Sequence, residues 1–141
     1  MIMVEVTLDL ELMSTEALLE GIAGARARAH AVARYYLEFT RDHEGQFRAF
    51  LAQTMKLWSP ENPPQLREAR RVGAFSMALE PVRGGMTSEA FRDLVHRLSM
   101  LTGLEQLIAM HDVLRLDVET GMRLQAEIVD AVLDRYLPEG A

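Results

Sequence analysis

The chain has 141 residues, of which 49% are hydrophobic and 26% charged, and its formal net charge is −6 at pH 7. This composition is typical of one globular domain, and the acidic balance argues against binding to nucleic-acid phosphates. The absence of cysteine excludes disulfides, a thiolate zinc site and a cysteine nucleophile. No apolar run approaches the roughly 18 residues of a membrane span, and no signal peptide is evident, so we expect a cytoplasmic protein without a membrane partner.

The first 13 residues form a segment of their own, because apolar and polar residues alternate from Val4 to Leu12. A period of two predicts a short β-strand, and no other part of the chain repeats it over such a length. A single strand needs a partner. It can pair with its own copy in a dimer, lie extended on the helices, or be the remnant of a longer chain.

From Ser14 onward the hydrophobic period becomes helical, so residues 14–141 are expected to form one all-α domain. The first helix is predicted to run from Ser14, which can cap it, to about Thr40. Gly21 and Gly24 are expected to weaken its first turns without ending it.

Two shorter helices are predicted on either side of a proline-rich loop. Gly45 marks a break before a helix over residues 46–56. Three prolines within residues 58–64 exclude a helix there. The next helix begins near Pro64 and is bent or ended by Pro81.

The last two helices have the clearest patterns. One is predicted from Thr87 or Ser88 to about Met110, and the other begins at its cap, Asp117, and ends before Pro138. Their apolar arcs are wider than the stripe of roughly 100° that a single core requires. A second copy is expected to cover the excess, which predicts a dimeric four-helix bundle. The residues predicted for this dimer interface are Met100, Leu104, Leu107, His111, Leu124, Ile128 and Val132.

The His111-Asp112 pair is the first candidate for chemistry, because an aspartate can orient a histidine as a general base. Adjacent residues on a helix do not face each other, however, and no serine nucleophile accompanies the pair. The alternative is a structural corner between two helices, where the histidine interacts with the helix dipole. No catalytic motif is assembled elsewhere, so we do not expect an enzyme.

No metal site and no cofactor are predicted. Asp93 and His96 have the spacing of two metal ligands, but they lie on a polar helix face, where solvated side chains are the alternative. Arg67, Arg70 and Arg71 form a basic cluster that either contacts an anion or offsets acidic surroundings.

Polar residues placed sparsely in an apolar wall predict a small-molecule pocket. Arg26 and His30 stand four residues apart on the apolar side of the first helix, and snorkelling at the core edge is their alternative interpretation. Glu105 falls on an apolar face, where an unpaired carboxylate is costly, so it is expected to bind an arginine, a ligand or a neighbouring backbone. The residues predicted to bind the ligand are Arg26, His30, Tyr36, Phe50, Trp58, Phe75 and Glu105.

Residues 79–133 contain a series of short motifs in a fixed order. Pro81–Gly84 precedes the long helix, Gly103–Glu105 lies near its middle, Asp112-Val113 ends it and Leu116-Asp117 begins the last helix. This order resembles the C-terminal domain of the tetracycline-repressor (TetR) family of transcription regulators. The resemblance implies an all-helical domain that binds a small-molecule effector and pairs through its last two long helices across a two-fold axis.

Members of that family begin with a three-helix DNA-binding unit, which the first 13 residues cannot hold. The chain is therefore either a fragment of a repressor or a relative without that unit. We expect a homodimer that binds an unknown small-molecule effector and makes no direct contact with nucleic acid. The alternatives are a stand-alone dimerisation protein that pairs with a full-length regulator and a small helical enzyme.

Overall fold

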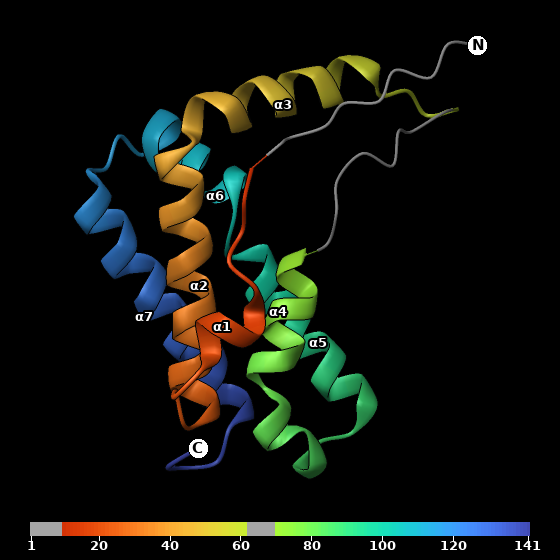
Figure 1. Cartoon of the computed structure of the whole chain (residues 1–141), viewed down its shortest axis with the longest axis vertical. Coiled ribbons are helices and arrows are strands. Elements are labelled where there is room, and N and C mark those ends of the chain that lie inside the picture. Colours follow the sequence, from red (N-terminus) through yellow and green to blue (C-terminus); the bar gives the residue numbers. More distant parts are fainter. Residues whose placement is uncertain (1–9, 62–69) are drawn as a thin grey trace.

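The computed structural model describes residues 10–61 and 70–141, and this part of the chain is all-helical (Figure 1). The all-α class is therefore confirmed for the described residues. The predicted strand lies almost wholly outside them, and its described end, residues 10–12, is not part of a strand. The helices are α1 (Thr15–Leu19), α2 (Ala25–Asp42), α3 (Glu44–Leu57), α4 (Arg70–Ala78), the 3₁₀ helix η1 (Glu80–Gly85), α5 (Ser88–Met100), α6 (Leu104–Ile108), the π-helical turn η2 (Ala109–Val113) and α7 (Val118–Tyr136).

The predicted first helix is two helices, and the expectation that its glycines would not interrupt it was wrong. Ser14 does cap α1, because its hydroxyl accepts a hydrogen bond from the backbone N–H of Ala17 at 3.2 Å. Gly21 and Gly24 then adopt positive φ angles of 77° and 89°. Glycine enters this region without the steric cost that other residues meet, so the chain turns there and restarts as α2.

The break after α2 lies at His43 rather than at Gly45, which is inside α3. Residues 58–61 are not helical, as the prolines predict. The helix start predicted at Pro64 lies outside the described residues. Pro81 falls in η1, just after the end of α4, so the predicted end of that helix is confirmed.

The prediction of one continuous helix to about Met110 was wrong. α5 ends at Met100, and Gly103 has a φ of 103°, from which α6 and then η2 continue. The Arg71 guanidinium lies directly over Gly103, where a side chain would collide with it. The cap predicted for the last helix is confirmed, since the Asp117 carboxylate accepts a hydrogen bond from the backbone N–H of Thr120 at 2.8 Å.

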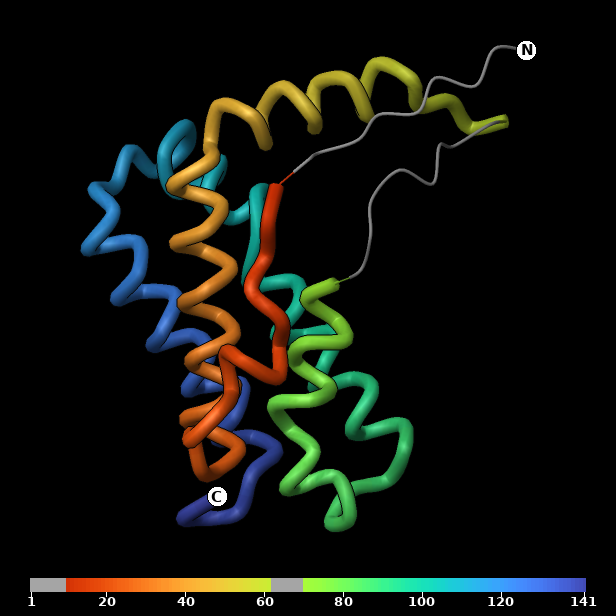
Figure 2. The backbone as a smooth tube through the Cα atoms, viewed as in Figure 1, coloured from red at the N-terminus to blue at the C-terminus, as the bar shows by residue number. Residues whose placement is uncertain are grey.

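The core lies where α2 packs between α4 and α7, with α1 and α5 completing the enclosure (Figures 1 and 2). α3 crosses the end of α2 and extends away from this bundle (Figure 2). The core side chains with no exposed surface include Val32, Phe75, Leu79, Leu94, Leu98, Val129 and Leu133. In the parts of the chain that the structure describes, no helix has both the length and the apolar content needed to cross a bilayer.

Arg28, a residue that the sequence patterns did not single out, fastens α2 to the end of α4. Its Nε donates to the carbonyl of Ala78 at 2.9 Å and its Nη2 donates to that of Met77 at 2.8 Å. The last carbonyls of a helix have no partner within the helix. Arg28 therefore satisfies acceptors that would otherwise be left unpaired beside the core.

Candidate functional site

The side of α7 that faces α2 carries an ionic seam. Arg26 reaches two carboxylates, with Nη1 at 2.9 Å from Asp130 Oδ1 and Nη2 at 2.7 Å from Asp134 Oδ1. His30 Nε2 lies 2.7 Å from the same Asp130 oxygen. The hydrogen bond from His30, and then that from Arg26, lower the pKa of Asp130 below its ordinary value. Two residues predicted to bind a ligand are thus engaged by α7.

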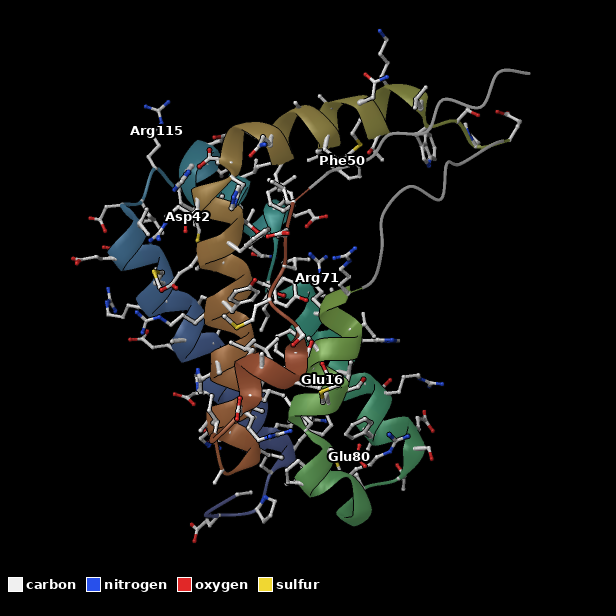
Figure 3. The ribbon with its side chains drawn as sticks, viewed as in Figure 1. Glu16, Asp42, Phe50, Arg71, Glu80 and Arg115 are labelled. Atoms are coloured by element: carbon white, nitrogen blue, oxygen red, sulfur yellow. The ribbon has the colours of Figure 1, made fainter. Side chains whose placement is uncertain are left out.

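The other predicted ligand residues lie in separate places and do not converge on one cavity. Phe75 is fully buried in the core, whereas Trp58 is 57% exposed beyond the end of α3. Phe50 lies on α3 (Figure 3). Glu105 lies on α6. Tyr36 is half-buried on α2 beside the ring of Tyr35, and burial raises its pKa. The structure therefore does not place these predicted ligand residues around a single pocket.

Glu105 confirms one expectation and corrects another. Its carboxylate lies 3.5 Å from the Arg71 guanidinium near the start of α4, so the predicted arginine partner is present. The side chain is 42% exposed, however, and does not sit in an apolar face. The expectation assumed one continuous helix from Ser88. The break at Gly103 resets the helical phase, and residues beyond it no longer share the faces of α5.

The same break corrects the predicted dimer interface. Leu104 and Leu107 were expected to face outward, but they are only 4% and 2% exposed and belong to this chain's own interior. Met100, on the near side of the break, is 72% exposed. The apolar surface that α5 and α6 offer is therefore much smaller than a continuous helix would give.

One flank of α7 is apolar, and the described part of the chain leaves it partly exposed. Gln125 is buried and donates to the carbonyl of Leu101 at 3.0 Å, which holds this part of α7 against the end of α5. Next to it on the helix surface, Ile128 is 49% exposed and Leu124 and Val132 are partly exposed. Three of the predicted interface residues thus form a strip along α7.

His111 and Asp112 do not pair with each other, as expected for a corner. The Asp112 carboxylate accepts two hydrogen bonds from Arg48, at 2.9 and 2.7 Å, which lower its pKa. His111 Nδ1 lies 3.1 Å from Glu44 Oε1, and Glu44 in turn bonds Arg48 at 2.8 Å. These four residues form a clasp between α3 and η2. His111 therefore faces α3 and not the outer strip of α7.

A narrow crevice lies between α2, η2 and the first turns of α7. Its enclosed part measures about 10 Å³, which is close to the space that one water molecule occupies. Its walls are Leu37, Leu107, Met110, Val118 and Met122, and its polar residues are Glu38, Arg41, His111 and Asp117. Of these, only His111 and Leu107 were among the predicted site residues. The signal for the crevice was Gly121, a glycine inside a helix, where close packing is the usual reason.

No group of three or more histidine, aspartate or glutamate side chains among residues 10–61 and 70–141 is arranged to hold a metal ion. Asp93 lies 3.9 Å from the side chain of Arg92 on the surface of α5. Comparison of the chain with protein-family models, with curated proteins and with solved structures finds no match. The resemblance to the TetR family stays a prediction that rests on residues 79–133.

Proposed function

We propose that the chain is a homodimerisation and effector-binding domain of the kind that TetR-family regulators carry. The observation that carries this proposal is the half-exposed Ile128 in the middle of the apolar outer strip of α7. The net charge of −6 supports a role without direct DNA contact.

α7 has more apolar surface than the described residues of its own chain cover. Val129 and Leu133 are completely buried against the core, whereas Leu124, Ile128 and Val132 retain exposed area beside them. α7 has 19 residues and is therefore about 28 Å long, which is enough for two copies to pack along each other. Such pairing across a two-fold axis buries the same strip on both protomers.

The proposed interface is smaller than the sequence predicts. It retains Met100, Leu124, Ile128 and Val132 and loses Leu104 and Leu107, which are buried, and His111, which is held by Glu44. Charged side chains flank the strip on α7, among them Arg123 and Glu127, which pair within the helix at 3.2 Å. An apolar centre with a polar rim is the usual construction of a protein–protein interface.

The test is the mass in solution, measured by size-exclusion chromatography with light scattering. The wild-type chain is expected to run as a dimer of two 15.9 kDa protomers. Ile128→Asp should convert it to a folded monomer, because a buried unpaired charge opposes association. Leu114→Asp is the matched control: Leu114 is 60% exposed but lies before α7, so this variant should remain dimeric.

A wild-type monomer at micromolar concentration would refute the dimer, and so would equal dissociation of both variants. Leu104→Asp is unsuitable for this test because Leu104 is buried, and a charge there would unfold the protomer itself. Circular dichroism of each variant separates loss of pairing from loss of folding.

A further inference from the structure

Met110, one of the side chains that line the crevice between α2, η2 and α7, is flexible and packs against Gly121. A methyl group added at Gly121 would lie 2.9 Å from Met110 Sδ, so the thioether of Met110 lies directly against the backbone of α7. Gly121 is buried and Met110 is half-buried. Methionine is unbranched and adapts to irregular spaces, so it can rotate away at low cost. Met110 therefore fills space that another apolar group can take.

The backbone that carries Met110 is also unusual. η2 is a π-helical turn, in which the backbone N–H of Leu114 donates to the carbonyl of Ala109 at 3.0 Å. π turns are uncommon and occur frequently at functional sites. The clasp of Glu44, Arg48 and Asp112 holds the outer side of this turn to α3. Met110 thus projects into the crevice from a segment that is anchored on its opposite side.

The charges around the crevice favour an uncharged occupant. Glu38 and Asp117 are acidic, whereas Arg41 is basic. Each already has a partner: Glu38 bonds Arg34 at 2.8 Å, Asp117 caps α7, and Arg41 bonds Asp42 at 3.0 Å. A ligand with a full charge of either sign would be repelled by a like charge and would have to compete with an existing partner of the opposite charge. An uncharged apolar ring experiences neither effect.

We propose that this crevice is the effector site, that Met110 occupies it in the absence of ligand, and that the ligand is a small uncharged molecule with an apolar ring. The assignment as an effector site rests on the proposed function, whereas binding itself does not. The walls are aliphatic and thioether side chains, which suit a ring that makes only a few polar contacts. The enclosed volume of about 10 Å³ holds no ring until Met110 moves.

The experiment is a titration of the wild-type protein with indole, followed through the methyl signals of ¹³C-methyl-labelled methionines. Met110 and Met122 line the crevice, so both signals should shift and saturate together. Met55 and Met100, which are 67% and 72% exposed elsewhere, are internal controls and should not move. The variants Met110→Leu and Met122→Leu assign the two signals. Equal shifts of all four would indicate adsorption to the surface and would overturn the proposal, as would the absence of any shift.

A pair of variants tests the role of Met110. Met110→Ala should bind indole about tenfold more tightly, because the ligand no longer has to displace a side chain to reach the binding-competent state. Met55→Ala, which truncates an exposed methionine on α3, should leave the affinity unchanged. Equal indole affinities in the two variants would overturn the assignment of Met110 as the group that fills the site.

Two further probes test the chemical class. Benzoate and benzylamine have a single ring with a negative or a positive charge, and each should bind less tightly than indole. An equal or higher affinity for either would overturn the uncharged class. The mass of the same samples separates the two proposals. A monomer that shows the Met110 shift refutes the dimer and keeps the site, and a dimer without the shift refutes the site and keeps the dimer.

Discussion

The consecutive helices α2 and α3 have similar amphipathic patterns but very different surroundings. α2 contacts α1, α4, α6 and α7, and six of its residues are buried: Ala25, Ala29, Val32, Ala33, Leu37 and Thr40. α3 is described over its whole length and has no buried residue. It is held at its beginning by α2 and by the clasp to η2, and it then extends beyond the bundle (Figure 1).

The difference between α2 and α3 shows that a helix can have an apolar face without having neighbouring helices that bury it. Phe47, Phe50 and Leu51 follow helical spacing on α3 just as Val32, Ala33 and Tyr36 do on α2. On α3 all three are only half-buried, although the ring of Phe47 contacts that of Phe39 with centroids 6.0 Å apart. Because burial removes apolar area from water, α2 should contribute far more to the free energy of unfolding than α3.

Matched leucine truncations provide the strongest test of this difference. Leu37→Ala on α2 should lower the free energy of unfolding by about 2–5 kcal/mol, because Leu37 is 2% exposed and its loss leaves a cavity. Leu51→Ala on α3 should cost under roughly 1.5 kcal/mol, since its side chain is only half-buried. Urea denaturation measures both. Equal losses would show that α3 is as well covered as α2.

Hydrogen exchange compares the two helices without a mutation. Local opening free energies range from near zero to the global value, and segments with little burial open most easily. The backbone amides of α3 should therefore exchange faster than those of α2 by about two orders of magnitude or more. Exchange followed by mass spectrometry or NMR resolves the two helices. Similar protection of both would mean that α3 opens only when the whole domain unfolds.

Some of the helix boundaries could be predicted from the sequence because they depend on local chemistry. Ser14 and Asp117 cap α1 and α7 through hydrogen bonds to backbone groups three residues ahead. Gly21, Gly24 and Gly103 could not be placed in the same way. A propensity scale counts the average cost of glycine in a helix, whereas a positive φ arises only where neighbouring elements require a turn.

The candidate site was predictable only in part, for the same reason. The wide apolar arc of α7 correctly marked Ile128 as exposed. Leu104 was misplaced because the break at Gly103 changes the phase of the helix that follows. The crevice at Met110 and the contacts of Arg28 join segments far apart in the chain. Gly121 is a local sign of close packing at the crevice, but it does not identify the other walls, and no local pattern indicates the contacts of Arg28.

The arginines of α2 give a test with a smaller effect. Arg28→Gln should lower the free energy of unfolding by about 1.5–3 kcal/mol, because the charged guanidinium bonds the carbonyls of Met77 and Ala78. Arg34→Gln is the control on the same helix, since Arg34 is 72% exposed and pairs with Glu38 one turn further along α2. That variant should change stability by under about 0.5 kcal/mol. Equal effects would contradict a structural role for Arg28 at the end of α4.

The ionic seam between α2 and α7 should contribute less to the free energy of unfolding than Leu37 or Arg28 does. Its contribution should also depend on pH. The hydrogen bond from His30 lowers the pKa of Asp130 in the folded chain below 3.8, so folding favours the ionised carboxylate. The stabilisation is therefore present above pH 3.8 and is lost as the pH falls through the depressed pKa. Asp130→Asn should cost about 0.2–1 kcal/mol near neutral pH, a small effect because the side chain is 49% exposed, and progressively less in acid. Urea midpoints between pH 7 and pH 3 measure this, with Glu127→Gln as a control that removes an exposed carboxylate of α7. A cost for Asp130→Asn that stays constant down to pH 3 would show that the seam does not stabilise the fold through the ionised form of Asp130.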